Sequence, residues 1–380
     1  MATLARARAA PSRSPSARAS LRSRESPRWI TRPKRSSRAT TNAASPSEYD
    51  DALLAAELES LVEDTRAAGG HAHTHVVAFS GGVDSSLCAY LVHRAFGGVG
   101  LSRRDGSDGV DGVGELRARK NYAYAAVGVS PSLPSSQLEV ARDIARSIGI
   151  PLREVFTNEG AVPAYVANEG ESCLHCKNEL YATLRAVALD AGLEKGFEKD
   201  DVPPSDVVVL MYNGTNLDDR ADPTRLGLMS AAAHGVRSPL RDTPKERVRQ
   251  LARVAGLPNW NLAAAPCLRS RLAFGVPALE RTLKDVEAAE EAVREILRVR
   301  PEENMRVRVL SDGGEKTDLS KRKKAALELD PRHLRVVEAD ASLREALREA
   351  LVRCGFEVAE TRAFASGSVA KLPPRRREKA

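Results

Sequence analysis

Hydrophobic and polar residues follow two periods along the middle of the chain, one typical of strands and one typical of helices. Short runs of β-branched and aromatic residues predict buried strands, and apolar residues at helical spacing predict amphipathic helices between them. Strands that alternate with helices predict an α/β fold with a doubly wound parallel sheet. The strands are expected at 75–79, 122–129, 152–156 and 207–212, and the helices at 48–67, 87–96, 136–148 and 178–191.

Beyond residue 262 the pattern changes to that of a smaller α+β domain. Helices are expected at 279–297 and 342–353, and strands at 305–310 and 356–359. Residues 97–119, rich in Gly and Asp, are expected to form a surface insertion. The sequence therefore divides into an N-terminal extension (1–47), an α/β domain (48–262), an α+β domain (263–370) and a basic tail (371–380).

The composition of the 380-residue chain excludes several classes of protein. A hydrophobic content of 42% suffices for sizeable cores, and no apolar run approaches the roughly 18 residues that a transmembrane helix needs. The net charge of +7 comes from the two ends, so the body between them is mildly acidic. An acidic body with 4% aromatic residues argues against a large nucleic-acid surface. Five cysteines do not make the disulfide framework of a secreted protein.

The first 47 residues are rich in Arg, Ser and Ala, with Glu25 as their single acidic residue. They lack the apolar stretch of a secretory signal, and their composition is typical of an organelle transit peptide, which we expect to be disordered. The high Ser content favours a chloroplast as the destination over a mitochondrion. The alternative is a basic arm that contacts nucleic acid.

The strongest chemical signal is the heptapeptide 80–86 (SGGVDSS), which lies between a predicted strand and a predicted helix. Gly81 and Gly82 let the backbone approach a ligand, and the N–H groups at the start of the helix attract anions. The hydroxyls of Ser80, Ser85 and Ser86 add hydrogen-bond donors for phosphate oxygens. The segment resembles the PP-loop of the ATP pyrophosphatases, which bind ATP and release pyrophosphate, and Asp84 is expected to help hold Mg²⁺.

Further motifs follow in an order that narrows the resemblance to one family of the ATP pyrophosphatases. Together with the loop they are similar to the ATP-dependent sacrificial sulfur transferases of the LarE family. The resemblance extends from about residue 50 to residue 310 and implies that Asn216 and Arg237 also bind ATP. The motifs are residues 173–177 (CLHCK), 213–219 (NGTNLDD), 235–240 (GVRSPL), 256–260 (GLPNW), 266–271 (PCLRSR) and 306–308 (RVR).

Three of the cysteines are candidates for sulfur chemistry. Cys173 and Cys176 form a CxxC pair, and with Cys267 they could ligate a [4Fe–4S] cluster that leaves one iron open. The resemblance implies the same, because many members of the family carry three cysteines for such a cluster. In members without a cluster, a cysteine in the region of Cys267 is itself the sulfur donor. A structural or redox role for the pair is the third alternative.

Paired arginines are candidates for binding an anionic substrate. Arg306 and Arg308 stand two residues apart on a predicted strand and therefore share a face, which suits a phosphate or a carboxylate. Arg271 is a similar candidate. The alternative is an ordinary charged face of a strand.

The resemblance implies an adenylating sulfur transferase. A carboxylate of a pyridinium dicarboxylate mononucleotide, the precursor of a nickel-pincer cofactor, would be activated by ATP and converted to a thiocarboxylate. We expect a homo-oligomer with no membrane or nucleic-acid partner. A PP-loop enzyme that thiolates tRNA and a degenerate ATP-binding protein are the alternatives.

Overall fold

The computed structural model describes residues 46–97, 122–194, 208–222, 225–311 and 323–365. The transit peptide predicted for the N-terminus, the predicted insertion from residue 98 onwards and the basic tail lie outside these ranges, apart from the last two residues of the extension.

A four-stranded sheet forms the centre of the larger part of the protein. Its strands are β1 (Thr74–Ala78), β2 (Tyr122–Val129), β3 (Leu152–Phe156) and β4 (Val209–Tyr212). They lie in the order β3-β2-β1-β4, and every neighbouring pair is parallel. The fold class predicted from the sequence is therefore confirmed, and the bounds predicted for β2 and β3 match the structure.

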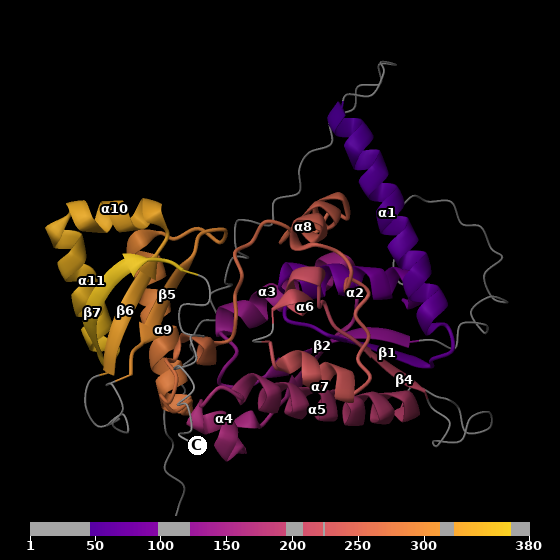
Figure 1. Ribbon diagram of the computed structural model, residues 1–380, viewed down its shortest axis with the longest axis horizontal. Coiled ribbons are helices and arrows are strands. Elements are labelled where there is room, and N and C mark those ends of the chain that lie inside the picture. Colours follow the sequence, from indigo (N-terminus) through magenta and orange to yellow (C-terminus); the bar gives the residue numbers. More distant parts are fainter. Residues whose placement is uncertain (1–45, 98–121, 195–207, 223–224, 312–322, 366–380) are drawn as a thin grey trace, which may run out of the picture. The chain divides into compact units, whose positions relative to one another are not determined.

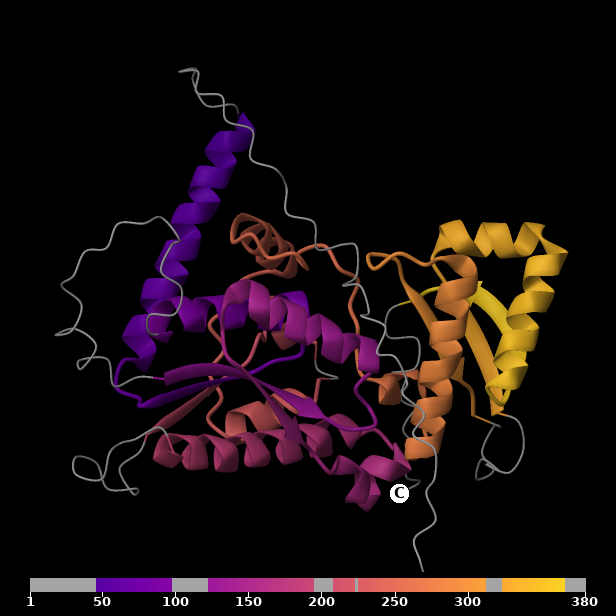
Figure 2. The same cartoon turned by 180° about the vertical axis from the view of Figure 1, so that it is seen from behind.

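Helices cover both faces of this sheet (Figures 1 and 2). On one face, α2 (Val83–Phe96) and α3 (Ser135–Ile148) contact the strands, and α1 (Pro46–Gly69) and α8 (Lys245–Val254) pack against α2. On the opposite face lies α5 (Ser172–Glu194), against which α7 (Gly227–Ala233) packs. The short segments η1 (Glu159–Ala161), α4 (Pro163–Ala167) and α6 (Leu217–Ala221) complete this part.

A second, three-stranded sheet follows in the C-terminal region. Its strands are β5 (Met305–Val309), β6 (Lys323–Leu329) and β7 (Phe356–Ala363), in the order β5-β6-β7. The first pair is antiparallel and the second is parallel, so the sheet is mixed. Its helices are α9 (Glu280–Leu297), α10 (Pro331–Ala339) and α11 (Ala341–Arg353), and η3 (Leu268–Arg271) precedes them. The sequence prediction did not include β6 or α10.

Two helix starts differ from the prediction in a way that matters for the site. Helix α2 begins at Val83, so the second half of the glycine-rich heptapeptide forms its first turn. Helix α5 begins at Ser172, six residues earlier than predicted, and therefore carries Cys173 and Cys176 on its first turns.

Within the described ranges, no helix has both the length and the apolar character that crossing a membrane requires.

Candidate active site

The turn from β1 into α2 leaves room for an anion. Gly82 is the N-cap of the 14-residue helix, and no side chain caps its first turn, so N–H groups there remain available. A Cβ at Gly82 would come no closer than 3.5 Å to the Ser80 hydroxyl. Gly81 is different, because its φ is +71° and a Cβ there would lie 2.8 Å from the Cα of Ala141 on α3. Gly81 permits close packing, whereas Gly82 borders open space.

The hydroxyls of the loop have different roles. Ser85 and Ser86 are buried, and both donate to the carbonyl oxygen of Gly82, at 3.0 and 2.9 Å. Ser80 is the exposed one. Buried Asn259 braces the loop, since its amide donates to the Gly81 carbonyl at 2.8 Å and to the Ser86 hydroxyl at 2.9 Å. Asn259 lies in the GLPNW motif, but no sequence pattern predicts its contact with the loop.

The Asp84 carboxylate is the centre of a small polar cluster. Its Oδ1 accepts a hydrogen bond of 3.0 Å from the amide of Asn216, and its Oδ2 forms an ion pair with Lys245. Asn216 is itself fixed by a capping box with Asp219 at the start of α6. Gly214 allows this approach, because a Cβ there would lie 2.4 Å from the backbone of Asp84. The structure thus brings Asn216 to the loop, while its contact with ATP stays a prediction, and it adds Lys245, which the sequence reasoning missed.

Arg237 contacts the end of β4 and the end of α1. Its backbone pairs with the end of β4, where its N–H donates to Met211 at 2.8 Å. Its guanidinium donates to the carbonyl of Ala68, near the end of α1. The proposed contact of Arg237 with ATP therefore stays a prediction.

Cys267 is tied to the same edge of the sheet as the loop. It is the N-cap of η3, and the N–H of the next residue, Leu268, donates to the carbonyl of Ser132 at 2.8 Å. Ser132 follows the carboxyl end of β2, and Ser80 follows the carboxyl end of the neighbouring parallel strand β1. The glycine-rich loop therefore starts at the carboxyl edge of the sheet, and the cysteine-bearing segment is hydrogen-bonded to that same edge, where ligands of open α/β sheets bind.

The CxxC pair lies near Cys267, together with two cations. Cys173 is exposed, and its sulfur accepts a hydrogen bond of 2.6 Å from Arg269. Cys176 packs against the core of the smaller sheet, and burial raises the pKa of its thiol to about 12. Burial alone would lower the pKa of Lys177, but Tyr181 and the three cysteines together raise it.

These cysteines do not form a metal site as they lie. Within the described ranges, no three His, Cys, Asp or Glu side chains are arranged to hold a metal ion. A cluster on Cys173, Cys176 and Cys267 would also require Arg269 to release the sulfur of Cys173. No chemical step is therefore assigned to a cluster, and the [4Fe–4S] centre stays a prediction.

The three arginines predicted to bind substrate are buried in the smaller part of the protein. Arg271 forms a two-fold ion pair with Glu290, at 2.9 and 3.0 Å. Arg308 donates to Glu328 at 2.9 Å and to the Ser270 carbonyl at 2.8 Å. Arg306 donates to the carbonyl oxygens of residues 264 and 305. As the structure stands, these guanidiniums hold the segment that carries Cys267, and a role in substrate binding stays a prediction.

We expect Glu290→Ala to lower the free energy of unfolding by about 3–5 kcal/mol, because it leaves Arg271 buried without a counter-charge. Urea denaturation measures this. Glu280 on the same helix is the matched control, because its pair with Lys284 is exposed and should contribute under about 1 kcal/mol. An equal loss of unfolding free energy in Glu290→Ala and Glu280→Ala would contradict the conclusion that the Arg271–Glu290 pair stabilises the Cys267 segment.

The fold and the site define an α/β protein in which a glycine-rich loop follows a strand of a parallel sheet and a cysteine-bearing segment is hydrogen-bonded to the same edge of that sheet. No protein-family model matches the chain. It is 32% identical over 294 residues to the uncharacterized protein slr1717 of the cyanobacterium Synechocystis, an alignment that covers 76% of this chain and 88% of that protein. The chain therefore belongs to the same family as slr1717.

A more distant relative has a chemical name. The pyridinium-3,5-bisthiocarboxylic acid mononucleotide synthase of Lactiplantibacillus plantarum is 24% identical over 222 residues, which is 58% of this chain and 67% of the synthase. This distant relative is an enzyme that makes a thiocarboxylate.

Proposed function

We propose that the protein is an ATP-dependent sulfur transferase of the LarE type. It adenylates a carboxylate of an acceptor that resembles a pyridinium dicarboxylate mononucleotide, and converts it to a thiocarboxylate with release of pyrophosphate and AMP. The observation that carries the proposal is the common edge of the sheet, where the Gly82 loop follows β1 and the Cys267 segment is hydrogen-bonded to Ser132, just after β2. The name of the distant bacterial relative supports the choice of acceptor.

The loop suits the triphosphate of ATP. The uncapped start of α2 and the open space at Gly82 would receive phosphate oxygens. Asp84 would hold Mg²⁺, with Asn216 fixing one of its oxygens and Lys245 close to the other. When bound, Mg²⁺ offsets the charge of the departing pyrophosphate. An acceptor carboxylate forms a bond to the α-phosphorus while the bond between that phosphorus and pyrophosphate breaks.

Cys267 supplies the sulfur in this proposal. The thiol releases its proton to water, and its sulfur forms a bond to the acyl carbon while the bond from that carbon to AMP breaks, which gives a thioester. The Cα proton then passes to a base and the Cβ–Sγ bond breaks, so that the thiocarboxylate leaves and dehydroalanine remains. The hydrogen bond from Leu268 to Ser132 holds the cysteine in place for these steps.

Pyrophosphate release with different acceptors tests the proposed function. The proposal expects release that depends on a pyridine dicarboxylate mononucleotide and not on tRNA. Release that depends on tRNA would replace this proposal with a tRNA-thiolating activity. No release with either acceptor would leave a nucleotide-binding protein without adenylating activity.

We also propose that residues 1–47 direct the protein to the chloroplast. A fluorescent protein fused behind these residues should enter chloroplasts, with mitochondria as the second candidate. The same fusion with the arginines of the segment replaced by glutamate is the control, and it should stay in the cytosol. A uniform cytosolic signal from the unaltered fusion would contradict the proposal.

A further inference from the structure

Two cations beside the cysteines stand out because they have no carboxylate partner. Within the described ranges, Lys177 and Arg269 form no ion pair with an acidic side chain. Arg269 donates to the side-chain oxygen of Asn168 at 3.1 Å and to the sulfur of Cys173. Neither contact supplies a full negative charge from a carboxylate.

The neighbouring arginines make the difference clear. Arg271 and Arg308 contact the Cys267 segment and pair with Glu290 and Glu328. Among the described residues Arg306 has no carboxylate partner either, but its guanidinium donates to two backbone carbonyl oxygens. Partly buried charges in proteins are normally paired, because an unpaired charge is costly to remove from water. A pair of cations that the protein leaves without counter-charges is therefore suited to an anion that arrives from outside.

Both cations lie beside the cysteines of the candidate site. Arg269 lies two residues after Cys267, on the short helix η3. Lys177 lies on α5 four residues after Cys173 and therefore on the same side of the helix, and Arg269 donates to the sulfur of that cysteine. On its other side Lys177 is confined by α7, since a Cβ at Gly227 would lie 3.1 Å from its Cγ. The ammonium of Lys177 and the guanidinium of Arg269 thus belong to different elements, α5 and η3, and both lie beside Cys173.

We infer that Lys177 and Arg269 together bind an oxyanion of the acceptor, either its second carboxylate or its phosphate, and hold its activated carbon beside Cys267. The inference rests on the proposed function for the identity of the acceptor. A guanidinium can donate two parallel hydrogen bonds to a carboxylate or phosphate, and an ammonium adds a compact charge. The role that the sequence suggested for Arg271, Arg306 and Arg308 is assigned here to Lys177 and Arg269.

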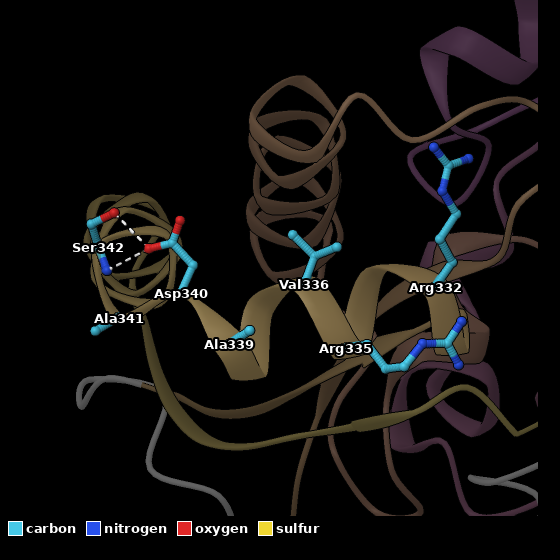
Figure 3. A pocket seen from close by; sticks show the side chains of 7 residues that line it. All are labelled: Arg332, Arg335, Val336, Ala339, Asp340, Ala341 and Ser342. Atoms are coloured by element: carbon cyan, nitrogen blue, oxygen red, sulfur yellow. Dashed lines mark hydrogen bonds between the residues drawn. The ribbon is translucent and has the colours of Figure 1, made fainter.

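A second group of cations provides a matched control. Figure 3 shows Arg332 and Arg335 lining a shallow hollow between α10 and α11. Arg332 pairs with Glu303, whereas Arg335 is exposed. Arg335→Gln therefore removes one positive charge from the same protein at a place where no anion site is inferred.

The experiment is calorimetric titration of the full chain without ATP. Pyridine-3,5-dicarboxylate and inorganic phosphate are the two probes, used separately, so that a carboxylate site and a phosphate site can be told apart. Lys177→Gln and Arg269→Gln should each weaken binding of the preferred probe about tenfold, which corresponds to about 1.4 kcal/mol. Lys177→Arg should keep the affinity within about threefold, and Arg335→Gln should bind like the unaltered protein.

Three results would overturn the inference: an unaltered protein that binds neither probe, affinities unchanged in both glutamine variants, or an equal loss in Arg335→Gln. Because the two positions lie on different elements, one variant still decides the question if the other does not fold. Binding is measured without turnover, so its outcome is independent of pyrophosphate release. If the unaltered protein binds the anion but releases no pyrophosphate with either acceptor, the proposed function is refuted and the anion site is not.

Discussion

Replacing Asp84 by alanine is expected to lower ATP-dependent pyrophosphate release at least about a hundredfold, the scale seen when a group that stabilises transition-state charge is removed. The Asp84 carboxylate is the acidic group at the uncapped start of α2, and it also positions Asn216 and Lys245. A coupled pyrophosphate assay measures the effect. Asp242→Ala is the control, because that aspartate is exposed and pairs with Arg220, not with a side chain that contacts Asp84.

Gly82→Val should cause a comparable loss for a different reason. Its φ of −75° is ordinary, so the side chain fits the backbone but fills the space that a phosphate would use. Gly81 is unsuitable for the same test, since any side chain there would press on α3. Circular dichroism should show a folded protein in the Gly82 variant. Turnover near that of the unaltered protein in both Asp84→Ala and Gly82→Val would remove the assignment of an ATP-binding loop.

Cys267→Ala is expected to abolish thiocarboxylate formation while pyrophosphate release continues. Adenylation needs the loop and the acceptor, whereas the sulfur is needed only afterwards. Chromatography of the products alongside the pyrophosphate assay separates the two steps. Cys354→Ala is the matched control, because that cysteine packs against the core of the smaller sheet and has no part in the proposed reaction.

The CxxC pair distinguishes the two predicted sulfur sources. If Cys267 is the donor, Cys173→Ala and Cys176→Ala should still form thiocarboxylate. If the three cysteines ligate a [4Fe–4S] cluster, the anaerobically purified protein should be brown, and each of the three variants should lose colour and sulfur transfer together.

The sequence was sufficient to predict the parallel sheet because its strands are short apolar runs between clear helical segments. The bounds of β2 and β3 match the prediction for this reason. Strand β6 was missed because KKAALEL has helix-forming residues and a charge at its sixth position. In the structure that residue, Glu328, is fully buried between Arg308 and Arg362. Its place in a strand depends on partners that are distant in the sequence.

The candidate site, too, could be predicted only where its residues are close together in the sequence. The glycine-rich loop was visible because its chemistry is local, with the glycines, the aspartate and the helix start in one heptapeptide. Lys245 and Asn259 were not visible, since they reach the loop from 161 and 178 residues away. Spacing placed Arg306 and Arg308 on one strand face, but it could not show that Glu328 of the neighbouring strand pairs with Arg308.

Mass spectrometry of the protein after one round of reaction tests whether Cys267 is the sulfur donor. The unaltered protein is incubated with ATP, Mg²⁺ and a pyridine dicarboxylate mononucleotide, and the peptide that contains Cys267 is then weighed. The account predicts that this peptide loses the mass of H₂S as the cysteine becomes dehydroalanine, with one AMP formed for each sulfur lost. Thiocarboxylate that accumulates while Cys267 keeps its full mass would contradict the account.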